Sequence, residues 1–155
     1  MFEIIQAESD KDVNCERELF RKYEAWLGLD LCFQGFEDEL RTLPGRYAMP
    51  EGRLLLANAK QNAAGCIALR KLDETTCEMK RLFVRDDFRG SGLGNTLVNR
   101  LTADARQIGY SKMRLDTYPP KMAKAVKLYE SHGFYPIPPY YDNPHDGVLF
   151  MERLL

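Results

Sequence analysis

The stretch RDDFRGSGLGNT (residues 85–96) places three glycines within five residues, directly after the apolar run LFV. The residues that follow, LVNRLTADARQIG, have the apolar spacing of a helix that runs to Gly109. A glycine-rich loop between a strand and a helix lets backbone N–H groups approach an anion closely. One glycine would suffice for a tight turn, so three glycines beside Arg89 predict an anion-binding loop.

Two common phosphate-binding motifs do not fit this loop. A P-loop requires G-x-x-x-x-G-K-[ST], whereas residues 90–96 read GSGLGNT, with Asn95 where the phosphate-binding lysine would stand. The dinucleotide fingerprint G-x-G-x-x-G also fails, because Gly90-x-Gly92 is followed by Asn95. The loop therefore belongs to neither of these nucleotide-binding classes.

The rest of the chain alternates strand-like and helical patterns. Strands are expected at residues 2–7, 53–59, 66–72, 76–85, 112–117, 134–137 and 147–154, and helices at residues 10–28, 36–43, 92–109 and 121–133. This order predicts a single domain over residues 1–155 with an α/β (α+β) fold. Its mixed, mostly antiparallel central sheet of about seven strands is flanked by four helices.

Composition narrows the functional classes. The 155 residues carry a formal net charge of −1, with 29% charged and 45% hydrophobic residues, so a nucleic-acid partner is not expected. No apolar run approaches the ~18 residues of a membrane span, and no signal peptide is visible, which predicts a cytoplasmic protein without a membrane partner. The four cysteines form no C-x-x-C pair and the two histidines lack metal-ligand spacing, so reduced thiols and no metal are expected.

Two motifs resemble the signatures of the GNAT superfamily of acetyl-coenzyme A-dependent N-acetyltransferases. The first, [Q/R]-x-x-G-x-[G/A], is matched by RGSGLG at residues 89–94. The second, A-x-x-L-Y-x-x-x-G-F, is matched at residues 125–134, and both occur in the family's order and separation. The chain also resembles a bacterial GNAT subgroup without a settled substrate. The resemblance implies a sheet splayed at its central parallel strand pair, and a homodimer is a possible assembly.

The resemblance implies acetyl-coenzyme A as the acyl donor, with the glycine loop on its pyrophosphate and the preceding strand along its pantetheine arm. Backbone amides at a helix N-terminus suit an anion of this kind. The cofactor residues implied are Leu82, Phe83, Val84, Arg89, Gly90, Ser91, Gly92, Leu93, Gly94 and Asn95. Many family members carry an asparagine three residues before the alanine of the second motif, and here that position is Met122.

Two residues are candidates for the chemistry. Tyr129 occupies the position where the family often has a general acid near the coenzyme A sulfur, although a packed helix tyrosine is the alternative. Glu78, eleven residues before Arg89, lies at the offset of a glutamate general base in several members. The alternative is a salt bridge with Lys80, Arg81 or Arg70. Strand alternation is expected to place Glu78, Lys80, Leu82 and Val84 on one face of the sheet.

The acceptor side is implied to lie between the first helices and the loop joining the last two strands. Phe33, Tyr140 and Tyr141, together with Phe36 and the acidic run at residues 37–39, are candidates to hold a small cationic amine or an N-terminus. Helix packing and a solvated acidic face are the alternative. The leading hypothesis is transfer of acetyl from acetyl-coenzyme A to a primary amine of a small molecule or peptide. An idle acyl-coenzyme A-binding module and a protein acetyltransferase remain open.

Overall fold

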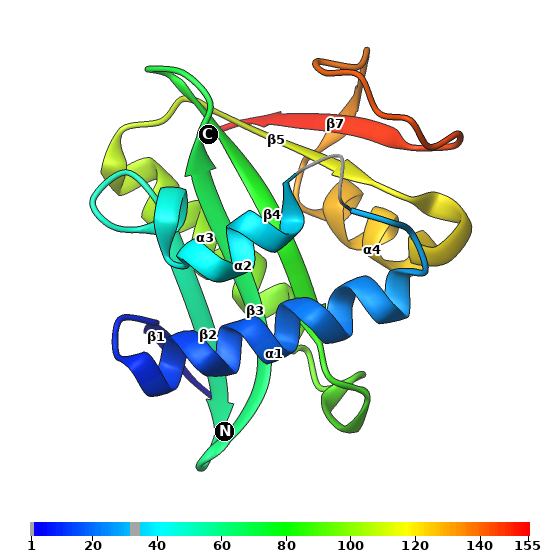
Figure 1. The fold of residues 1–155 in the computed structure, drawn as a ribbon. Helices are drawn as coiled ribbons and strands as arrows, with labels where there is room; N and C mark the ends of the chain where they lie inside the picture. Colours follow the sequence, from blue (N-terminus) through cyan, green and yellow to red (C-terminus); the bar gives the residue numbers. More distant parts are fainter. Residues whose placement is uncertain (1, 32–34) are drawn as a thin grey trace.

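The computed structural model describes residues 2–31 and 35–155, and Figure 1 shows their path. Seven strands form one sheet in the order β1-β2-β3-β4-β5-β7-β6, and only the β4–β5 pair is parallel among the six pairings. The strands are β1 (Phe2–Gln6), β2 (Arg53–Ala59), β3 (Asn62–Lys71), β4 (Thr76–Val84), β5 (Lys112–Thr117), β6 (Tyr135–Ile137) and β7 (Leu149–Leu154). The predicted mixed, mostly antiparallel sheet is confirmed.

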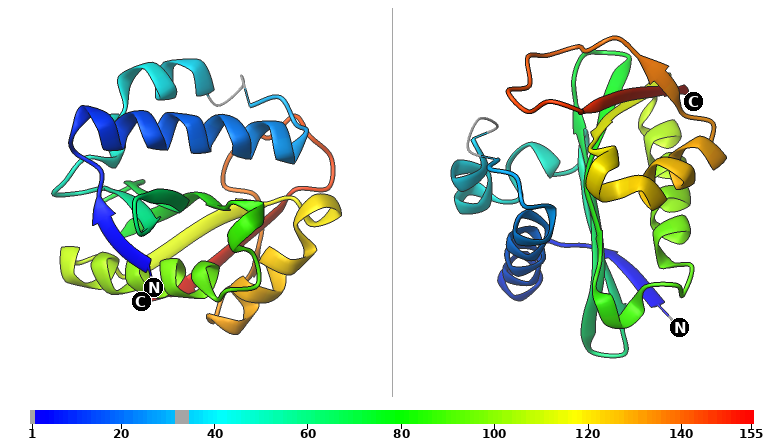
Figure 2. Two further views of the ribbon diagram at one scale, coloured as in Figure 1. Left: turned by 90° about the horizontal axis from the view of Figure 1, so that it is seen from below. Right: turned by 90° about the vertical axis from the view of Figure 1, so that its right-hand side faces the viewer.

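Four α-helices cover the two faces of the sheet. They are α1 (Asp10–Leu27), α2 (Phe36–Thr42), α3 (Leu93–Ile108) and α4 (Pro119–Ser131), with short 3-10 turns at η2 (Gly45–Tyr47) and η3 (Asp86–Phe88). Figure 2 shows α1 and α2 on one face and α3 and α4 on the other. Ser9 caps α1 by accepting a hydrogen bond from the Asp12 amide, one residue before the expected start of this helix at Asp10.

A separate apolar core lies on each face of the sheet. On the α3/α4 face, Leu97 and Leu101 of α3 pack on inward side chains of the strands, among them Ile67 and Met113. On the α1/α2 face, Phe20 of α1 belongs to the core formed with α2 and β2. Burial of two large apolar faces is the main stabilising contribution to such a three-layer arrangement.

A β-bulge in β4 changes which face each of its residues occupies. Cys66 pairs with Phe83 and Ala68 pairs with Lys80, so one residue of β3 lies opposite both Arg81 and Leu82. Arg81 has a φ of 61°, which is uncommon for a residue other than glycine.

The expectation that Glu78, Lys80, Leu82 and Val84 share one face is therefore wrong. Lys80 lies opposite Ala68, whose side chain is in the α1/α2 core, and Glu78 shares that face. Leu82 and Val84 instead pack against the α3/α4 core, because the extra residue reverses the alternation.

β4 and β5 separate after a short paired stretch. The parallel ladder joins Thr76, Cys77 and Glu78 to Lys112, Met113 and Arg114, whereas β4 continues to Val84 and β5 to Thr117. Figure 1 shows the two strands diverging, with α4 near the opening. The predicted splay is confirmed, and it leaves one edge of β4 beyond Glu78 without a strand partner.

Candidate active site

A cavity with a volume of about 520 Å³ lies at this splay. Ligand-binding pockets usually enclose ~300–1,000 Å³, so the cavity has room for a sizeable ligand. Its walls come from the end of β4, the glycine loop, the first part of α4 and one residue of α1. The lining residues are Trp26, Leu82, Phe83, Val84, Phe88, Arg89, Gly90, Gly92, Leu93, Gly94, Lys121, Met122, Ala123, Lys124, Ala125 and Leu128.

The N-terminus of α3 opens into this cavity. Gly92 is the N-cap residue with a φ of 85°, and no side chain caps the helix. Gly90 has a φ of 80°, so both glycines adopt a conformation that side chains disfavour. The first amides of a helix lack acceptors within it and carry a partial positive charge. These backbone amides suit an anion, and the role of the loop as an anion site stays a prediction.

Several side chains of the loop hold the loop itself in place. Arg89 donates from Nε to the Val84 carbonyl oxygen over 3.0 Å and pairs with Asp86 over 2.8 Å. The Ser91 hydroxyl donates to the Phe88 carbonyl, and Asn95 Oδ1 lies 2.7 Å from His132 Nε2 at the end of α4. Leu93 is buried in the core. Backbone amides are thus the groups that the loop offers to a ligand, together with the Arg89 charge at the cavity wall.

Trp26 is a member of this site that sequence reasoning missed. Its ring lies under two cations, with Arg89 Cζ 5.1 Å and Lys121 Nζ 5.4 Å from the ring centroid. Trp26 fits the apolar period of α1, so the sequence predicted only a core role for it. The packing of this end of α1 on the end of β4, where Trp26 contacts Phe83, is a tertiary feature with no local sequence signal.

Tyr129 lies just behind the large cavity. It is 4% exposed and packs edge-to-face on Phe134, with 5.8 Å between the ring centroids. It lines a second cavity of about 20 Å³, which shares Leu82 and Met122 with the large one. Burial raises the pKa of Tyr129 far above its ordinary value, with Tyr23 and Asp116 adding to the effect, so the phenol is protonated.

Glu78 is a buried and fully engaged carboxylate. It is 1% exposed, its Oε1 accepts from Arg70 Nε over 2.7 Å, and its Oε2 accepts from the Tyr140 hydroxyl over 2.6 Å. Burial raises the pKa of Glu78, but the combined effect of Lys80, Arg70 and the Tyr140 hydrogen bond is larger, so the pKa lies below its ordinary value. The structure thus contains the salt bridge left open as an alternative, with Arg70 as the partner.

The loop between β6 and β7 brings Tyr140 and Tyr141 to the centre of the sheet. The Tyr141 hydroxyl donates to Asp116 Oδ2 over 2.6 Å, and both rings pack on Phe150 of β7 with centroid distances of 5.3 and 5.1 Å. The loop thus lies beside Glu78, while its role in binding the acceptor stays a prediction. Phe33, the third acceptor residue predicted, lies outside the described residues.

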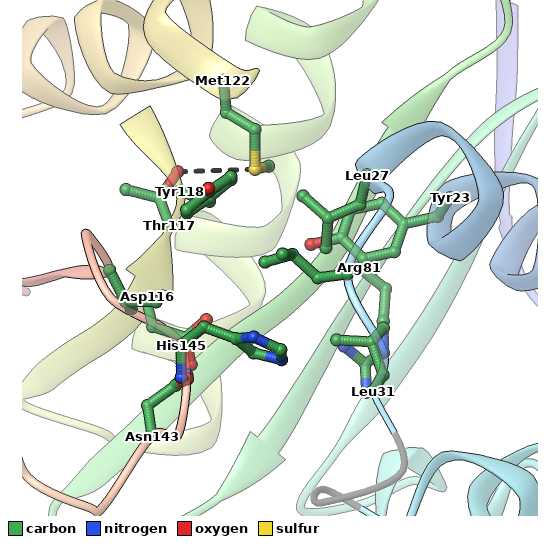
Figure 3. Close-up of a pocket in the computed structure, with 12 residues that line it drawn as sticks. Tyr23, Leu27, Leu31, Arg81, Asp116, Thr117, Tyr118, Met122, Asn143 and His145 are labelled. Carbon is green, nitrogen blue, oxygen red and sulfur yellow. Dashed lines mark hydrogen bonds between the residues drawn. The ribbon is translucent and has the colours of Figure 1, made fainter. Parts of the chain in front are cut away.

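A third cavity, of about 20 Å³, opens on the α1/α2 face of the splay. Figure 3 shows Tyr23 and Leu27 of α1 on one side of it, and Asp116, Asn143 and His145 on the other. Met122 lines all three cavities, so the position that departs from the family pattern lies where they meet.

The acidic run of α2 does not line that cavity. Arg81 pairs with both oxygens of Glu39 over 2.9 and 3.0 Å, and Arg21 pairs with Glu37 over 3.3 Å. Asp38 pairs with Arg41. Phe36 is fully buried, with the Arg81 guanidinium over its ring. Phe36 and Glu39 thus hold α2 on the sheet through Arg81, whereas Glu37 and Asp38 form exposed ion pairs, which agrees with the alternative of helix packing and a solvated acidic face.

Comparison with known proteins agrees with this geometry. Residues 16–134 match the model of the acetyltransferase (GNAT) family. The chain belongs to that family. It is 32% identical to an uncharacterized N-acetyltransferase of Dictyostelium discoideum, covering 96% of this chain and 97% of the relative, and 38% identical to an uncharacterized N-acetyltransferase of Schizosaccharomyces pombe, covering 92% and 88%.

A solved structure shares the fold at low identity. The PaiA N-acetyltransferase of Thermoplasma acidophilum, in complex with coenzyme A, superposes with a TM-score of 0.75 at 17% identity, covering 100% of this chain and 99% of that one. The family match and the two N-acetyltransferase relatives identify this GNAT chain as an acyltransferase. The bacterial subgroup stays a prediction, since the two relatives named come from eukaryotes.

Residues 2–31 and 35–155 contain no cluster of three or more histidine, cysteine, aspartate or glutamate residues placed to hold a metal ion. No helix in the same part of the chain has the length and apolar character needed to cross a membrane.

Proposed function

We propose that this GNAT chain, as one domain over residues 1–155, transfers the acetyl group of acetyl-coenzyme A directly to a primary amine bound beside it. The observation that carries the proposal is the cavity of about 520 Å³ between the unpartnered edge of β4 and the uncapped N-terminus of α3. Coenzyme A requires both features, because its pantetheine arm has amides and its pyrophosphate is an anion. The coenzyme A complex of the PaiA protein is consistent with this choice.

The cofactor is placed by backbone groups more than by side chains. Its pantetheine amides pair with β4 as an added strand, next to Leu82, Phe83 and Val84. Its pyrophosphate lies on the amides of the glycine loop, with Arg89 supplying a positive charge at the wall. The loop residues in this role are Gly90, Ser91, Gly92, Leu93, Gly94 and Asn95.

In this mechanism the neutral amine attacks the thioester carbonyl carbon. A carbon–nitrogen bond forms, the carbon–sulfur bond breaks, and the thiolate requires a proton. Tyr129 supplies that proton, since its raised pKa keeps the phenol protonated and it lies beside the wall that the two cavities share. Glu78 is proposed as the base or as an orienting group. Its downward pKa shift and its two occupied oxygens support the orienting role.

The acceptor is proposed to be a small molecule or a peptide bearing a primary amine, held between α1 and the β6–β7 loop by Tyr140, Tyr141 and Phe33. The cavity on that side has a volume of about 20 Å³, so an acceptor of either kind requires the side chains that line it to move apart. A homodimer is proposed as the assembly.

Thiol release tests the proposal directly. The purified protein, acetyl-coenzyme A and a panel of primary amines are mixed, and free thiol is measured against samples without protein. Amine-dependent release supports transfer. A large thermal shift with acetyl-coenzyme A but no release with any amine would instead identify an idle binding module. A thermal shift with NAD or ATP, and none with acetyl-coenzyme A, would contradict the cofactor assignment itself.

A further inference from the structure

Lys80 is a buried lysine in the middle of the sheet. It lies on β4 opposite Ala68, and its side chain is 7% exposed. It lines the cavity of about 20 Å³ in the splay together with Leu82, Tyr129 and Met122. Leu82 and Met122 also line the large cavity, and Met122 lines the cavity on the acceptor side. Lys80 therefore lies between the region proposed for the thioester and the region proposed for the amine.

The cavity between Lys80 and Tyr129 has the size of one water molecule. A buried water needs roughly 10–15 Å³ of such space and two to four polar partners. The cavity measures about 20 Å³, and its lining includes three residues with polar side chains, Lys80, Tyr129 and Asp116. The cavity therefore has room for one water, which could bridge the lysine and the tyrosine.

The charged groups around Lys80 come from three strands. They are Glu78 and Arg81 on β4, Arg70 on β3 and Asp116 on β5, while Tyr23 of α1 and Tyr129 of α4 line the same cavity. Burial lowers the pKa of Lys80, Arg81 lowers it further, and Glu78 and Asp116 raise it, for a net value of about 8. A lysine in this range is neutral in part of the molecules near neutral pH and accepts a proton there.

We propose that Lys80 accepts the proton that the attacking amine loses and returns it through the cavity water to Tyr129. This inference rests on the proposed transferase function. When nitrogen bonds to the carbonyl carbon, one N–H proton passes to Lys80 Nζ. Tyr129 protonates the thiolate as the carbon–sulfur bond breaks, and the Lys80 ammonium reprotonates the phenolate through the water. The sum is amine plus acetyl thioester giving amide plus thiol, with both residues restored.

Glu78 is less suited to accept this proton. Its two oxygens already accept hydrogen bonds from Arg70 and Tyr140. Protonation of Glu78 would disrupt its ion pair with the Arg70 guanidinium. Lys80 lines the same cavity as Tyr129, and a lysine carries a lone pair when it is deprotonated. In this arrangement Glu78 acts on Lys80 by its charge, as a positioning residue.

The first test measures Lys80 without any acceptor. The protein is labelled with ¹³C at the lysine ε-carbons, the Lys80 signal is assigned by its loss in Lys80→Arg, and its shift is followed from pH 6 to 11 with coenzyme A bound. The expected midpoint is about 8. A midpoint at the ordinary value of ~10.4 would overturn the proposal, because the amine would then be charged at working pH.

The second test is kinetic and uses the amine that gives the highest thiol release. Lys80→Gln should lower kcat by roughly a hundredfold or more and remove the ionisation near pH 8 from the kcat/KM profile, while the acetyl-coenzyme A thermal shift persists. Lys80→Arg keeps the positive charge but does not titrate, so it should be as slow as Lys80→Gln. Lys11→Gln, an exposed position on α1, is the matched control and should behave as wild type.

The relay predicts that the two residues act as one unit. The Lys80→Gln/Tyr129→Phe double variant should be about as slow as the slower single variant, because either change interrupts the same proton path. If the rate losses of the two single variants multiply in the double variant, the relay is overturned. Wild-type turnover in Lys80→Arg would overturn it as well, because a positive charge at this position would then suffice. If the wild-type protein does not release thiol with any of the amines tested, the transferase function and the relay both fail. If thiol is released and the ionisation survives in Lys80→Gln, the relay alone fails.

Discussion

The Tyr140 hydroxyl donates a hydrogen bond to Glu78 Oε2 over 2.6 Å, which ties the β6–β7 loop to the centre of β4. Arg70 holds the other oxygen of the same carboxylate, and the Arg114 guanidinium lies 5.3 Å from the centroid of the Tyr140 ring. The loop on the acceptor side and the buried carboxylate therefore form one connected unit. A substitution of Tyr140 should therefore affect both the β6–β7 loop and the Glu78 carboxylate.

We expect Tyr140→Phe to affect the acceptor more than the cofactor. The change leaves Glu78 with one partner fewer, so the pKa of Glu78 should rise towards its ordinary value, and the loop should lose an anchor. The KM for the amine should increase by roughly tenfold, as expected for the loss of a hydrogen bond to a charged group, while the acetyl-coenzyme A thermal shift stays unchanged.

Tyr135→Phe is the matched control for that change. The Tyr135 hydroxyl donates to Glu152 Oε1 over 3.0 Å. Tyr135→Phe therefore also removes one tyrosine–carboxylate hydrogen bond, but at the β6 edge of the sheet. Its amine KM should equal that of wild type. Equal KM values in Tyr140→Phe and wild type would show that the loop needs no anchor at Glu78.

Tyr129→Phe should separate cofactor binding from turnover. The change removes only the hydroxyl, and the ring keeps its contact with Phe134, so folding and coenzyme A affinity should survive. Turnover should fall by roughly ten- to a thousandfold, because a general acid acts mainly in the transition state. Calorimetry with coenzyme A and kcat measurements on the same sample decide the matter. Wild-type kcat would return Tyr129 to the role of a packed helix tyrosine.

The glycine loop offers two positions that differ in their physical requirement. Gly92 has a φ of 85° and an added Cβ would meet no atom within 4 Å, so its cost is conformational, about 1–2 kcal/mol. Gly94 has ordinary helical geometry, and its Cβ would lie 3.5 Å from Leu128 Cδ2, an ordinary contact. Gly94→Val should therefore fold well and still weaken coenzyme A binding by well over tenfold, because its side chain enters the cavity.

Gly92→Val should lower both the melting temperature and the affinity. Thermal melts without ligand and calorimetry with coenzyme A separate the two effects for each variant. Undiminished affinity in folded Gly94→Val would sink the proposal that the loop amides hold the pyrophosphate.

The elements with strong local signals were predictable from the sequence. Helix α3 begins after glycines that favour positive φ and ends at Gly109, and its apolar period is visible in a short window. The succession of strands and helices along the chain followed from the apolar patterns and the hairpin spacing. The connection between β2 and β3 was predicted too long. Strand β3 was expected to begin at residue 66, but it begins at Asn62 after a turn of only Lys60–Gln61, with a positive φ at Lys60 where asparagine is usual.

The β4 bulge could not be predicted from local sequence signals. Arg81 adopts a positive φ that its own side chain disfavours, and it is held by an ion pair with Glu39, 42 residues away in sequence. Pattern analysis assumes unbroken alternation, so it assigned Leu82 and Val84 to the wrong face. For the same reason it missed Lys80, whose position between the donor and acceptor sides depends on the bulge and the splay together.

The buried carboxyl of Glu16 should make the stability of the fold depend on pH. Glu16 lies on α1, is 0% exposed, and neither of its oxygens has a hydrogen-bond partner among the described residues. Burial raises the pKa of Glu16 well above its ordinary value, and Asp12 adds to the effect. The folded protein therefore keeps a proton that the unfolded chain releases near pH ~4.3.

The sign of the effect follows from proton linkage. A group whose folded pKa is raised contributes stability that is fully present below the unfolded pKa and is lost as pH rises through the folded value. Glu16→Gln resembles the protonated side chain at every pH, so it should match wild type near pH 4 and exceed its melting temperature increasingly towards pH 8. Glu18→Gln, an exposed neighbour on α1, serves as the control and should show no such trend. If the melting temperatures of wild type and Glu16→Gln change in parallel from pH 4 to 8, the Glu16 carboxyl is solvated or paired after all.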